Sequence, residues 1–249
     1  MFLSIQEQSN IESENEIKLR GLKTFVEHLK KLGMGLQILE DVMEAALIET
    51  KVLWVLWPDR WFMPPEITGV KTRLEAGMGL LVTSEWSGIE YNAEILNNLV
   101  EDLGIKFNKD RIIDPINAYS ESELKGEGKG KGSLIGGKVV EFIKIKDFGP
   151  HKIVSGISEL AYYSGCSLTV STSKLLAKSK FVSFSDVDGD KKWSEGEKIG
   201  SATASAFSEF GKGRIVAVGD TSLFTDKYIK FGDNEKFMDN TLKWLLGQI

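Results

Sequence analysis

Residues 52–57 form an unbroken run of apolar side chains, Val-Leu-Trp-Val-Leu-Trp, which Pro58 closes. A strand with one face in water alternates polar and apolar residues, whereas a strand without polar residues must be buried on both faces. Strands of this kind are typical of the centre of a parallel sheet that helices cover on both sides. The run therefore predicts a layered protein with a sheet in its middle.

The rest of the first half continues this pattern, because apolar runs alternate with segments of helical periodicity. Such an order predicts right-handed crossovers between parallel strands. We therefore expect a flavodoxin-like α/β fold with a mainly parallel sheet and helices on both faces. The expected strands are 2–5, 35–39, 52–57 and 80–83, and the expected helices are 14–32, 41–48, 64–77 and 92–103.

The second half has shorter apolar runs and more turn residues. Gly211-Lys212-Gly213 lies between two strand-like segments and predicts a C-terminal antiparallel hairpin that extends the sheet. Residues 121–137 are predicted to be a mobile Gly/Lys-rich loop and residues 185–198 an acidic loop insert in a single domain spanning 1–249. The other expected elements are an extended segment 105–115, strands 139–145, 167–171, 180–184, 202–210 and 214–219, and a helix 235–246.

The charge balance excludes some classes of partner. With 31 basic and 36 acidic residues the net charge is −5, which does not suit a general nucleic-acid binder, since neutralising phosphates needs clustered basic side chains. No apolar run reaches the ~20 residues that span a bilayer, and the first residues lack the basic and long apolar regions of a signal peptide. Cys166 is the single cysteine, which fits a reducing compartment. We expect a soluble, cytoplasmic protein.

A set of motifs stands in order along most of the chain. They are residues 52–58 followed by Pro65-Glu66, 75–82 (EAGMGLLV), 104–107 (GIKF), 150–153 (PHKI) with Gly156-Ile157, 210–224 (FGKGRIVAVGDTSLF) and 240–245 (NTLKWL). Together they resemble the amidotransferase-like domain of GldG-type gliding proteins, an intraflagellar transport subunit and uncharacterised prokaryotic proteins. The resemblance implies a class I glutamine amidotransferase-like, Rossmann-like fold. For this branch it also implies a non-catalytic binding or assembly module.

The residues that would carry amidotransferase chemistry are missing. Such an enzyme needs a thiolate on a tight strand-to-helix turn and a histidine base within reach. The turn after strand 80–83 begins with Ser84 and has no cysteine, and strand 214–219 is followed by Asp220 rather than a histidine. Ser84 lacks the flanking glycines of a nucleophile elbow, and Cys166 lies far along the chain. We therefore predict no catalytic residues and a pseudoenzyme.

The strand ends offer a binding site instead, because ligands of open α/β sheets bind at the carboxyl ends of the strands. Acids and hydroxyls that converge there beside tryptophans would form a pocket for a small polar ligand. The alternative, that the tryptophans cover the core and the acids cap helices, stays open. The candidate residues are Asp59, Ser84, Glu85, Asp220, Thr221 and Ser222, near Trp57, Trp61 and Trp86, with Gln6 and Glu7 expected at the same edge.

Residues 186–197 (DVDGDKKWSEGE) match the spacing of a calcium loop. Such loops place oxygen ligands at positions 1, 3, 5, 7 and 12, because calcium takes about six to eight oxygens. Lys191 departs from the pattern, since it replaces the glycine of the sharp turn, and the interpretation as a solvated acidic turn stays open. The candidate ligands of a structural calcium ion are Asp186, Asp188, Asp190, the carbonyl of Lys192, and Glu197.

Three functions are compatible with these observations. The first is a non-catalytic amidotransferase-like binding or scaffold protein with a protein partner or a small polar ligand. The second is a hydrolase that acts on a small sugar or amide through strand-end carboxylates such as Asp59, Glu85 or Asp220, since paired acids can share general acid and base work. The third is a calcium-dependent interaction module, which calcium would stabilise against unfolding.

Overall fold

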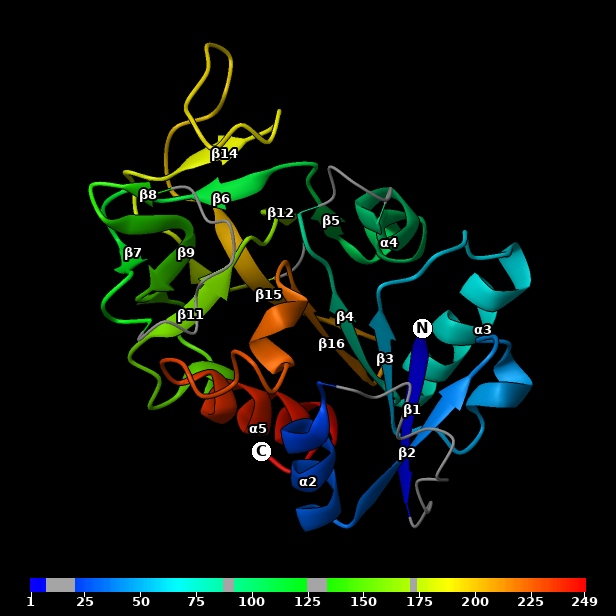
Figure 1. The fold of residues 1–249 in the computed structure, drawn as a ribbon. Coiled ribbons are helices and arrows are strands. Elements are labelled where there is room, and N and C mark those ends of the chain that lie inside the picture. The colour runs from blue at the N-terminus through cyan, green and yellow to red at the C-terminus, as the bar shows by residue number, and fades with distance from the viewer. Residues whose placement is uncertain (8–20, 87–91, 125–133, 171–173) are drawn as a thin grey trace.

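The computed structural model describes residues 1–7, 21–86, 92–124, 134–170 and 174–249. Its main element is a mixed sheet of 10 strands in the order β10-β13-β15-β16-β4-β3-β1-β2, with β12 paired to β15 and β5 (Figure 1). The strands are β1 (Phe2–Glu7), β2 (Met34–Leu39), β3 (Val52–Leu56), β4 (Gly79–Thr83), β5 (Ile105–Phe107), β10 (Asp147–Phe148), β12 (Leu168–Val170), β13 (Lys174–Lys178), β15 (Thr203–Phe210) and β16 (Gly213–Val218).

The remaining strands form two smaller antiparallel sheets. The first contains β7 (Ala118–Ser120), β8 (Leu134–Ile135), β9 (Lys138–Ile145) and β11 (Leu160–Tyr163), and the second contains β6 (Arg111–Ile113) and β14 (Phe184–Asp186). The helices are α2 (Lys23–Lys31), α3 (Pro64–Ala76), α4 (Asn92–Val100) and α5 (Asn234–Leu245), with 3₁₀ helices η1 (Glu44–Leu47), η2 (Glu101–Leu103), η3 (Lys152–Val154) and η4 (Thr221–Phe224).

The centre of the large sheet is parallel. β4 pairs in parallel with β3 on one side and with β16 on the other, so that Val52, Gly79 and Arg214 are aligned at the start of the three strands. Every residue of β3 and β4 is buried. The interpretation of the apolar run 52–57 as a strand buried on both faces is confirmed for its first five residues.

The prediction of a flavodoxin-like, mainly parallel sheet is wrong. β1 runs antiparallel to both β2 and β3 and separates them, and β12, β13 and β16 are all antiparallel to β15. Apolar periodicity reports burial on both faces, and a central antiparallel strand is buried in the same way as a parallel one. A helix between two strands also does not determine whether the strands run parallel. α2 lies between β1 and β2 in the sequence, and these two strands are antiparallel neighbours.

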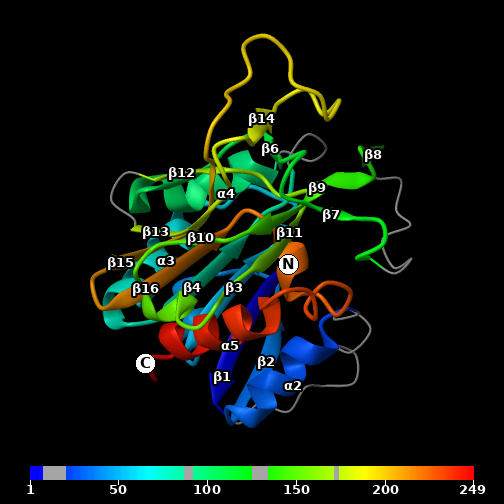
Figure 2. The ribbon, with the colours of Figure 1, turned by 90° about the vertical axis from the view of Figure 1, so that its left-hand side faces the viewer.

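Helices cover both faces of the large sheet (Figure 2). On one face α2 and α5 pack through side chains such as Phe25 and Phe237, in one hydrophobic cluster with Trp54 of β3. On the other face α3 and α4 pack through side chains such as Leu74 and Leu96, in a second cluster. Successive side chains of a strand point to opposite faces, so the fully apolar β3 supplies both clusters.

The start of α3 follows the sequence signals. Pro64 and Pro65 occupy the first turn, and the Glu66 carboxylate accepts the Met63 N–H at 3.0 Å. Arg60 donates two further hydrogen bonds to Glu66, at 2.7 and 2.8 Å. These bonds outweigh the effect of burial and lower the pKa of Glu66 to about 2. The helix ends at Gly77, which is left-handed with φ of 115° as a helix terminus of this kind requires.

Other elements depart from their predicted bounds. The hairpin around Gly211 is confirmed as β15 and β16, whereas the predicted strand 180–184 is wrong because a turn occupies residues 181–182 between β13 and β14. The predicted helix 41–48 is the short 3₁₀ helix η1, and 92–103 divides into α4 and η2. Residues 14–20 of the predicted helix 14–32, and 125–133 of the predicted mobile loop, lie outside the described residues.

Candidate functional site at the strand ends

Hydrogen bonds join the loop that follows β4 to the end of β16 and the loop after it. Ser84 donates its N–H to the carbonyl of Val218 at 3.0 Å. The carbonyl of Ser84 accepts the Thr221 N–H at 2.8 Å and the Thr221 hydroxyl at 3.0 Å. The structure therefore brings the predicted residues Ser84 and Thr221 together where the parallel strands end.

Asp220 is fully buried at the start of η4 and satisfies several donors there. One carboxylate oxygen accepts the N–H of Ser222 at 2.8 Å and also the Ser222 hydroxyl. The other oxygen accepts the N–H of Tyr163 at 2.6 Å, which ties β11 to the end of β16. Asp220 therefore caps η4 and links it to β11, which agrees with the alternative that the strand-end acids cap helices.

Glu85 and Asp220 form an electrostatically coupled pair. Burial raises the pKa of Asp220 to about 7, against the hydrogen bonds from Ser222 and Tyr163. Burial also raises the pKa of Glu85 well above its ordinary value, the negative charge of Asp220 raises it further, and the Ser222 N–H opposes the shift. Two carboxyl groups that share one desolvated place cannot both ionise at low cost. Burial of both groups and the charge of Asp220 on Glu85 therefore favour the protonated form of the carboxyls.

Three further residues extend this cluster, and the sequence reasoning missed them. Tyr163 stacks on Tyr228 with ring centroids 4.9 Å apart, and burial raises the pKa of each phenol to about 12. The charge of Glu141, from β9, acts on both phenols. Glu141 is 2% exposed, and no described residue donates a hydrogen bond to its Oε2 atom. An isolated acid in the apolar run of β9 was the signal that could have identified it.

Cys166 lies closer to Ser84 than its position in the sequence indicated. Its thiol interacts with the Ser84 hydroxyl, while its N–H donates to the carbonyl of Gly219 at 2.9 Å. Burial and then the charge of Asp110 raise the pKa of the Cys166 thiol well above its ordinary value. A thiol that resists ionisation in an apolar place is a poor nucleophile. Cys166 is therefore a buried packing residue beside Ser84.

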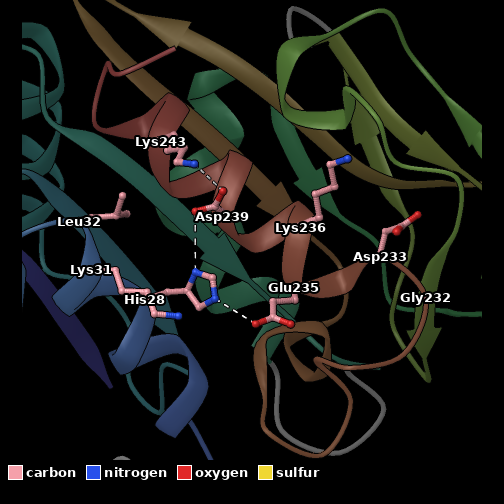
Figure 3. A pocket seen from close by; sticks show the side chains of 9 residues that line it. All are labelled: His28, Lys31, Leu32, Gly232, Asp233, Glu235, Lys236, Asp239 and Lys243. Atoms are coloured by element: carbon pink, nitrogen blue, oxygen red, sulfur yellow. Dashed lines mark hydrogen bonds and ion pairs between the residues drawn. The ribbon is translucent and has the colours of Figure 1, made fainter.

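Both histidines are engaged elsewhere. His151 packs against Phe207 with ring centroids 3.9 Å apart and a tilted geometry. His28 lies in α2 and contacts two acids of α5, Glu235 at 3.0 Å and Asp239 at 3.8 Å (Figure 3). These residues line a pocket of about 560 Å³, and the lining contains both lysines and acidic residues. His28 joins the two helices on that face of the sheet.

The remaining predicted residues are dispersed. Asp59 is exposed, and its charge acts on the amino group of Met1. Trp57 and Trp61 are 44% and 57% exposed. Glu7 pairs with Lys51 at the start of β3, so its expected position beside the other strand ends is wrong. The reason is the antiparallel direction of β1, which places its carboxyl end at the opposite edge.

Trp86 follows Glu85 and lies between the strand ends and the acidic loop. The guanidinium of Arg111 lies 4.2 Å from its ring centroid. A Cβ atom on Gly189 would collide with the same ring. The indole Nε1 of Trp86 is buried and finds no hydrogen-bond partner in the part of the chain that the structure describes. The acidic loop therefore packs against Trp86, which directly follows Glu85 of the strand-end cluster.

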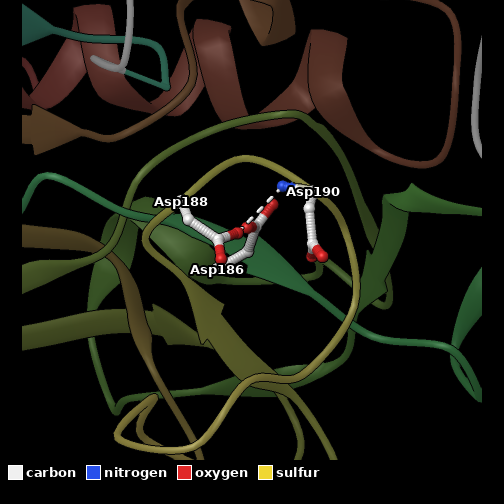
Figure 4. Close-up of side chains that lie close together, drawn as sticks. All are labelled: Asp186, Asp188 and Asp190. Atoms are coloured by element: carbon white, nitrogen blue, oxygen red, sulfur yellow. Dashed lines mark hydrogen bonds between the residues drawn. The ribbon is translucent and has the colours of Figure 1, made fainter.

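The acidic loop gathers three of its predicted ligands, because one carboxylate oxygen each from Asp186, Asp188 and Asp190 lies within 4.8 Å of the others (Figure 4). Asp186 is already neutralised, however. Its Oδ2 atom accepts Nη2 and Nε of Arg111 at 2.7 and 3.1 Å, in a pair whose side chains are 0% and 5% exposed. A guanidinium therefore occupies the place of a cation on Asp186.

The fourth predicted carboxylate ligand, Glu197, turns into the loop itself, and the backbone N–H of Lys192 binds Asp190. Glu197 accepts the N–H groups of Val187 at 2.8 Å and Ser194 at 2.9 Å, and Lys192 donates its N–H to Asp190 at 2.7 Å. Lys191, which replaces the expected glycine, adopts the left-handed backbone with φ of 65°. Its ammonium group reaches Glu141 at 2.7 Å. Calcium binding stays a prediction, and the loop is anchored by one buried ion pair, Arg111 with Asp186, and one partly buried ion pair, Lys191 with Glu141.

The structure is similar to known folds. It matches the mmIFT52 N-terminal domain with a TM-score of 0.68 and 17% identity, over 97% of this chain and 95% of that chain. Cytoplasmic protein STM1381 from Salmonella typhimurium LT2 gives a TM-score of 0.47 and 12% identity over 82% and 75% of the two chains. A ThuA-like protein from Bacteroides uniformis gives 0.46 and 11% over 96% and 88%. The first match supports a shared fold, and the other two carry no argument.

No curated protein matches the chain. The resemblance to an intraflagellar transport subunit is supported at the level of the fold, whereas these matches give no support to the class I glutamine amidotransferase assignment. Among the described helices, none is both long and apolar enough to cross a bilayer. The family model described as "Domain of unknown function (DUF4350)" matches residues 19–242, and the protein therefore belongs to the DUF4350 family.

Proposed function

We propose that this protein is a non-catalytic binding domain that holds a small polar ligand at the carboxyl ends of β4 and β16. The observation that carries the proposal is the carboxyl cluster of Glu85, Asp220 and Glu141, beside two tyrosines. Glu141 leaves a buried oxygen without a partner, and an unsatisfied buried acceptor is costly. A ligand with hydroxyl or amine donors would satisfy it.

The chemistry of the cluster supports binding over catalysis. Cys166 has a thiol with a raised pKa, and His28 and His151 contact other parts of the molecule. Asp220 already accepts three hydrogen bonds. A carboxylate that is committed in this way stabilises the loop and is poorly placed to exchange protons with a substrate.

A hydrolase is the second candidate, because the coupled pKa values of Glu85 and Asp220 favour it. A carboxylic acid that stays protonated near neutral pH can act as a general acid. The Glu85→Gln variant separates the two functions. Turnover of a sugar or amide substrate that this variant abolishes would support the hydrolase, whereas binding without turnover in the wild-type protein supports the binding domain.

A protein partner is a further part of the proposal. Its support is the fold shared with the mmIFT52 N-terminal domain and a group of exposed apolar residues around the acidic loop. These are Phe181, Val187, Trp193 and Ile199, each more than half exposed. Large apolar side chains that gather on a surface mark interaction sites. Polar replacement of Phe181 and Trp193 together should abolish partner binding and leave ligand binding unchanged.

The test of ligand binding is a thermal melt against glutamine, sugars and nucleotides. A ligand that binds only the folded protein raises the melting temperature, and the rise grows with the logarithm of the ligand concentration divided by Kd. We expect at least one hydroxyl- or amine-rich ligand to raise it, and the Glu85→Gln and Glu141→Gln variants to lose the rise. Glu40→Gln, at an exposed position outside the cluster, is the matched control. A rise that survives both cluster variants would place the ligand elsewhere.

A further inference from the structure

A polar cavity lies on the side of the large sheet where β3, β4 and β16 begin, opposite the strand-end cluster. It has a volume of about 350 Å³ and is lined by the ends of α3 and α5. Its charged side chains are Lys51, Arg73, Arg214 and Glu7. Because the lining contains three basic side chains and one acidic side chain, this concave site has an excess of positive charge. Such a place attracts anions.

The two arginines are not neutralised by acids. Neither Arg73 nor Arg214 makes an ion pair with a residue that the structure describes. Arg73 donates Nη2 to the carbonyl of Ile48 at 2.8 Å, but its Nε is buried and has no hydrogen-bond partner among the described residues. A buried charged donor without an acceptor is costly. An acceptor brought by a ligand would remove that cost.

Arg214 is held in position by packing. Its guanidinium lies 5.9 Å from the ring centroid of Trp244, and a Cβ atom on Gly247 would come within 2.7 Å of its Nη1 atom. Gly247, with φ of 75°, therefore leaves room for the guanidinium against the backbone. A guanidinium fixed in this way has donors to offer at little further cost in side-chain entropy.

We propose that this cavity binds a phosphate group. Arginine forks match the oxygens of phosphate, and a phosphate monoester carries a charge of about −1.5 to −2 at neutral pH. That charge balances the excess of the lining, which a single carboxylate would not. The competing explanation is that Arg73 and Arg214 only compensate the negative ends of the α3 and α5 dipoles. In that case phosphate would bind no better than chloride.

The test is calorimetric titration of the whole protein with inorganic phosphate, in chloride at matched ionic strength. We expect saturable binding, weakened at least about tenfold by Arg73→Gln and by Arg214→Gln, which corresponds to about 1.4 kcal/mol. Lys30→Gln, at an exposed position in α2 that forms no ion pair with a described residue, should leave the affinity unchanged. The Arg214 variant decides the matter, because Arg214 donates no hydrogen bond within the described chain and its loss should leave the fold intact.

Two further arms identify the source of the phosphate. Phosphatidylcholine vesicles with and without phosphatidic acid would detect a lipid headgroup, and glycerol 3-phosphate would detect a soluble ester. Binding in either arm that depends on Arg214 supports the site. Equal affinity in the wild-type protein and both arginine variants, or a response that chloride reproduces, would overturn it. The strand-end site would be unaffected by that result, because its residues lie at the other edge of the sheet.

Discussion

Asp220 serves the fold and constrains the site at the same time. It is fully buried, it joins η4 to β11 through its hydrogen bonds, and its charge acts on Glu85. The sequence identified five residues that do meet at the strand ends: Ser84, Glu85, Asp220, Thr221 and Ser222. It did not identify Tyr163 of β11, or Tyr228 between η4 and α5, because these segments reach the site through tertiary contacts that local periodicity does not encode. The isolated acid in the apolar run of β9 marks Glu141, but periodicity alone does not show that β9 reaches the strand ends.

The coupled carboxyls predict an unusual dependence of stability on pH. Asp220 has a pKa of about 7 in the folded protein, above its ordinary value of 3.8, and the pKa of Glu85 is raised as well. The folded state therefore binds more protons than the unfolded state between these values, and this contribution to stability is lost as pH rises from about 4 to about 7. Relative to wild type, Glu85→Gln should gain stability as pH rises through this window.

Urea unfolding at a series of pH values measures this effect, since the denaturant midpoint follows the free energy of unfolding. Glu40→Gln, which changes an exposed acid, should run parallel to the wild type. Parallel curves for wild type and Glu85→Gln would contradict the coupling of the two carboxyls.

The buried pair of Arg111 and Asp186 is a second prediction at this scale. Arg111→Met should destabilise the protein by about 3–5 kcal/mol, because it leaves a buried carboxylate without compensation. The exposed pair of Lys71 with Asp102 provides the control, since Lys71→Met should cost only ~0–1 kcal/mol. Equal losses in the two variants would show that Arg111 does not compensate Asp186.

The same variant tests the calcium prediction. Calcium must displace Arg111 from Asp186 to complete its shell, so we expect calcium and a chelator to give the same melting temperature for the wild type. In Arg111→Met calcium should restore part of the lost stability, because it can take the place of the guanidinium on the three aspartates. A rise in the wild type that Asp188→Asn abolishes would contradict this and establish a calcium loop.

At the scale of elements, the close approach of β16 to the segment around Cys166 gives the site its shape. A Cβ atom on Gly219 would collide with the carbonyl oxygen of Cys166 and the hydroxyl of Tyr162. Gly33, by contrast, has open space around it, and only its φ of 72° favours glycine. The sequence placed Gly219 at the end of the predicted strand 214–219 and Gly33 directly after the predicted helix 14–32, but it could not separate a steric requirement from a conformational one.

Gly219→Ala should therefore cost about 3 kcal/mol, the upper part of the usual range for overpacking. Gly33→Ala should cost about 1–2 kcal/mol from backbone strain alone. Thermal unfolding of the two variants makes the comparison. A smaller loss for Gly219→Ala than for Gly33→Ala would show that the loop yields, and that the approach of the two segments does not fix the site.

At the scale of the whole molecule, the sequence predicted the burial of the central strands but not the direction of their neighbours. Burial on both faces is recorded in the composition of β3 and β4, whereas the antiparallel insertion of β1 depends on pairing across the sheet. The result is a mixed sheet with polar sites at both edges. The carboxyl cluster lies where the parallel strands end, and the arginines lie where they begin.

The central claim is that the carboxyl cluster binds a small polar ligand without converting it. The most direct measurement is titration calorimetry with the ligand found in the thermal melt, followed by analysis of the recovered ligand. We predict that the ligand is recovered unchanged and that Glu85→Gln and Glu141→Gln each weaken its binding at least about tenfold. Recovery of a hydrolysed product, or an affinity that neither variant alters, would contradict the account.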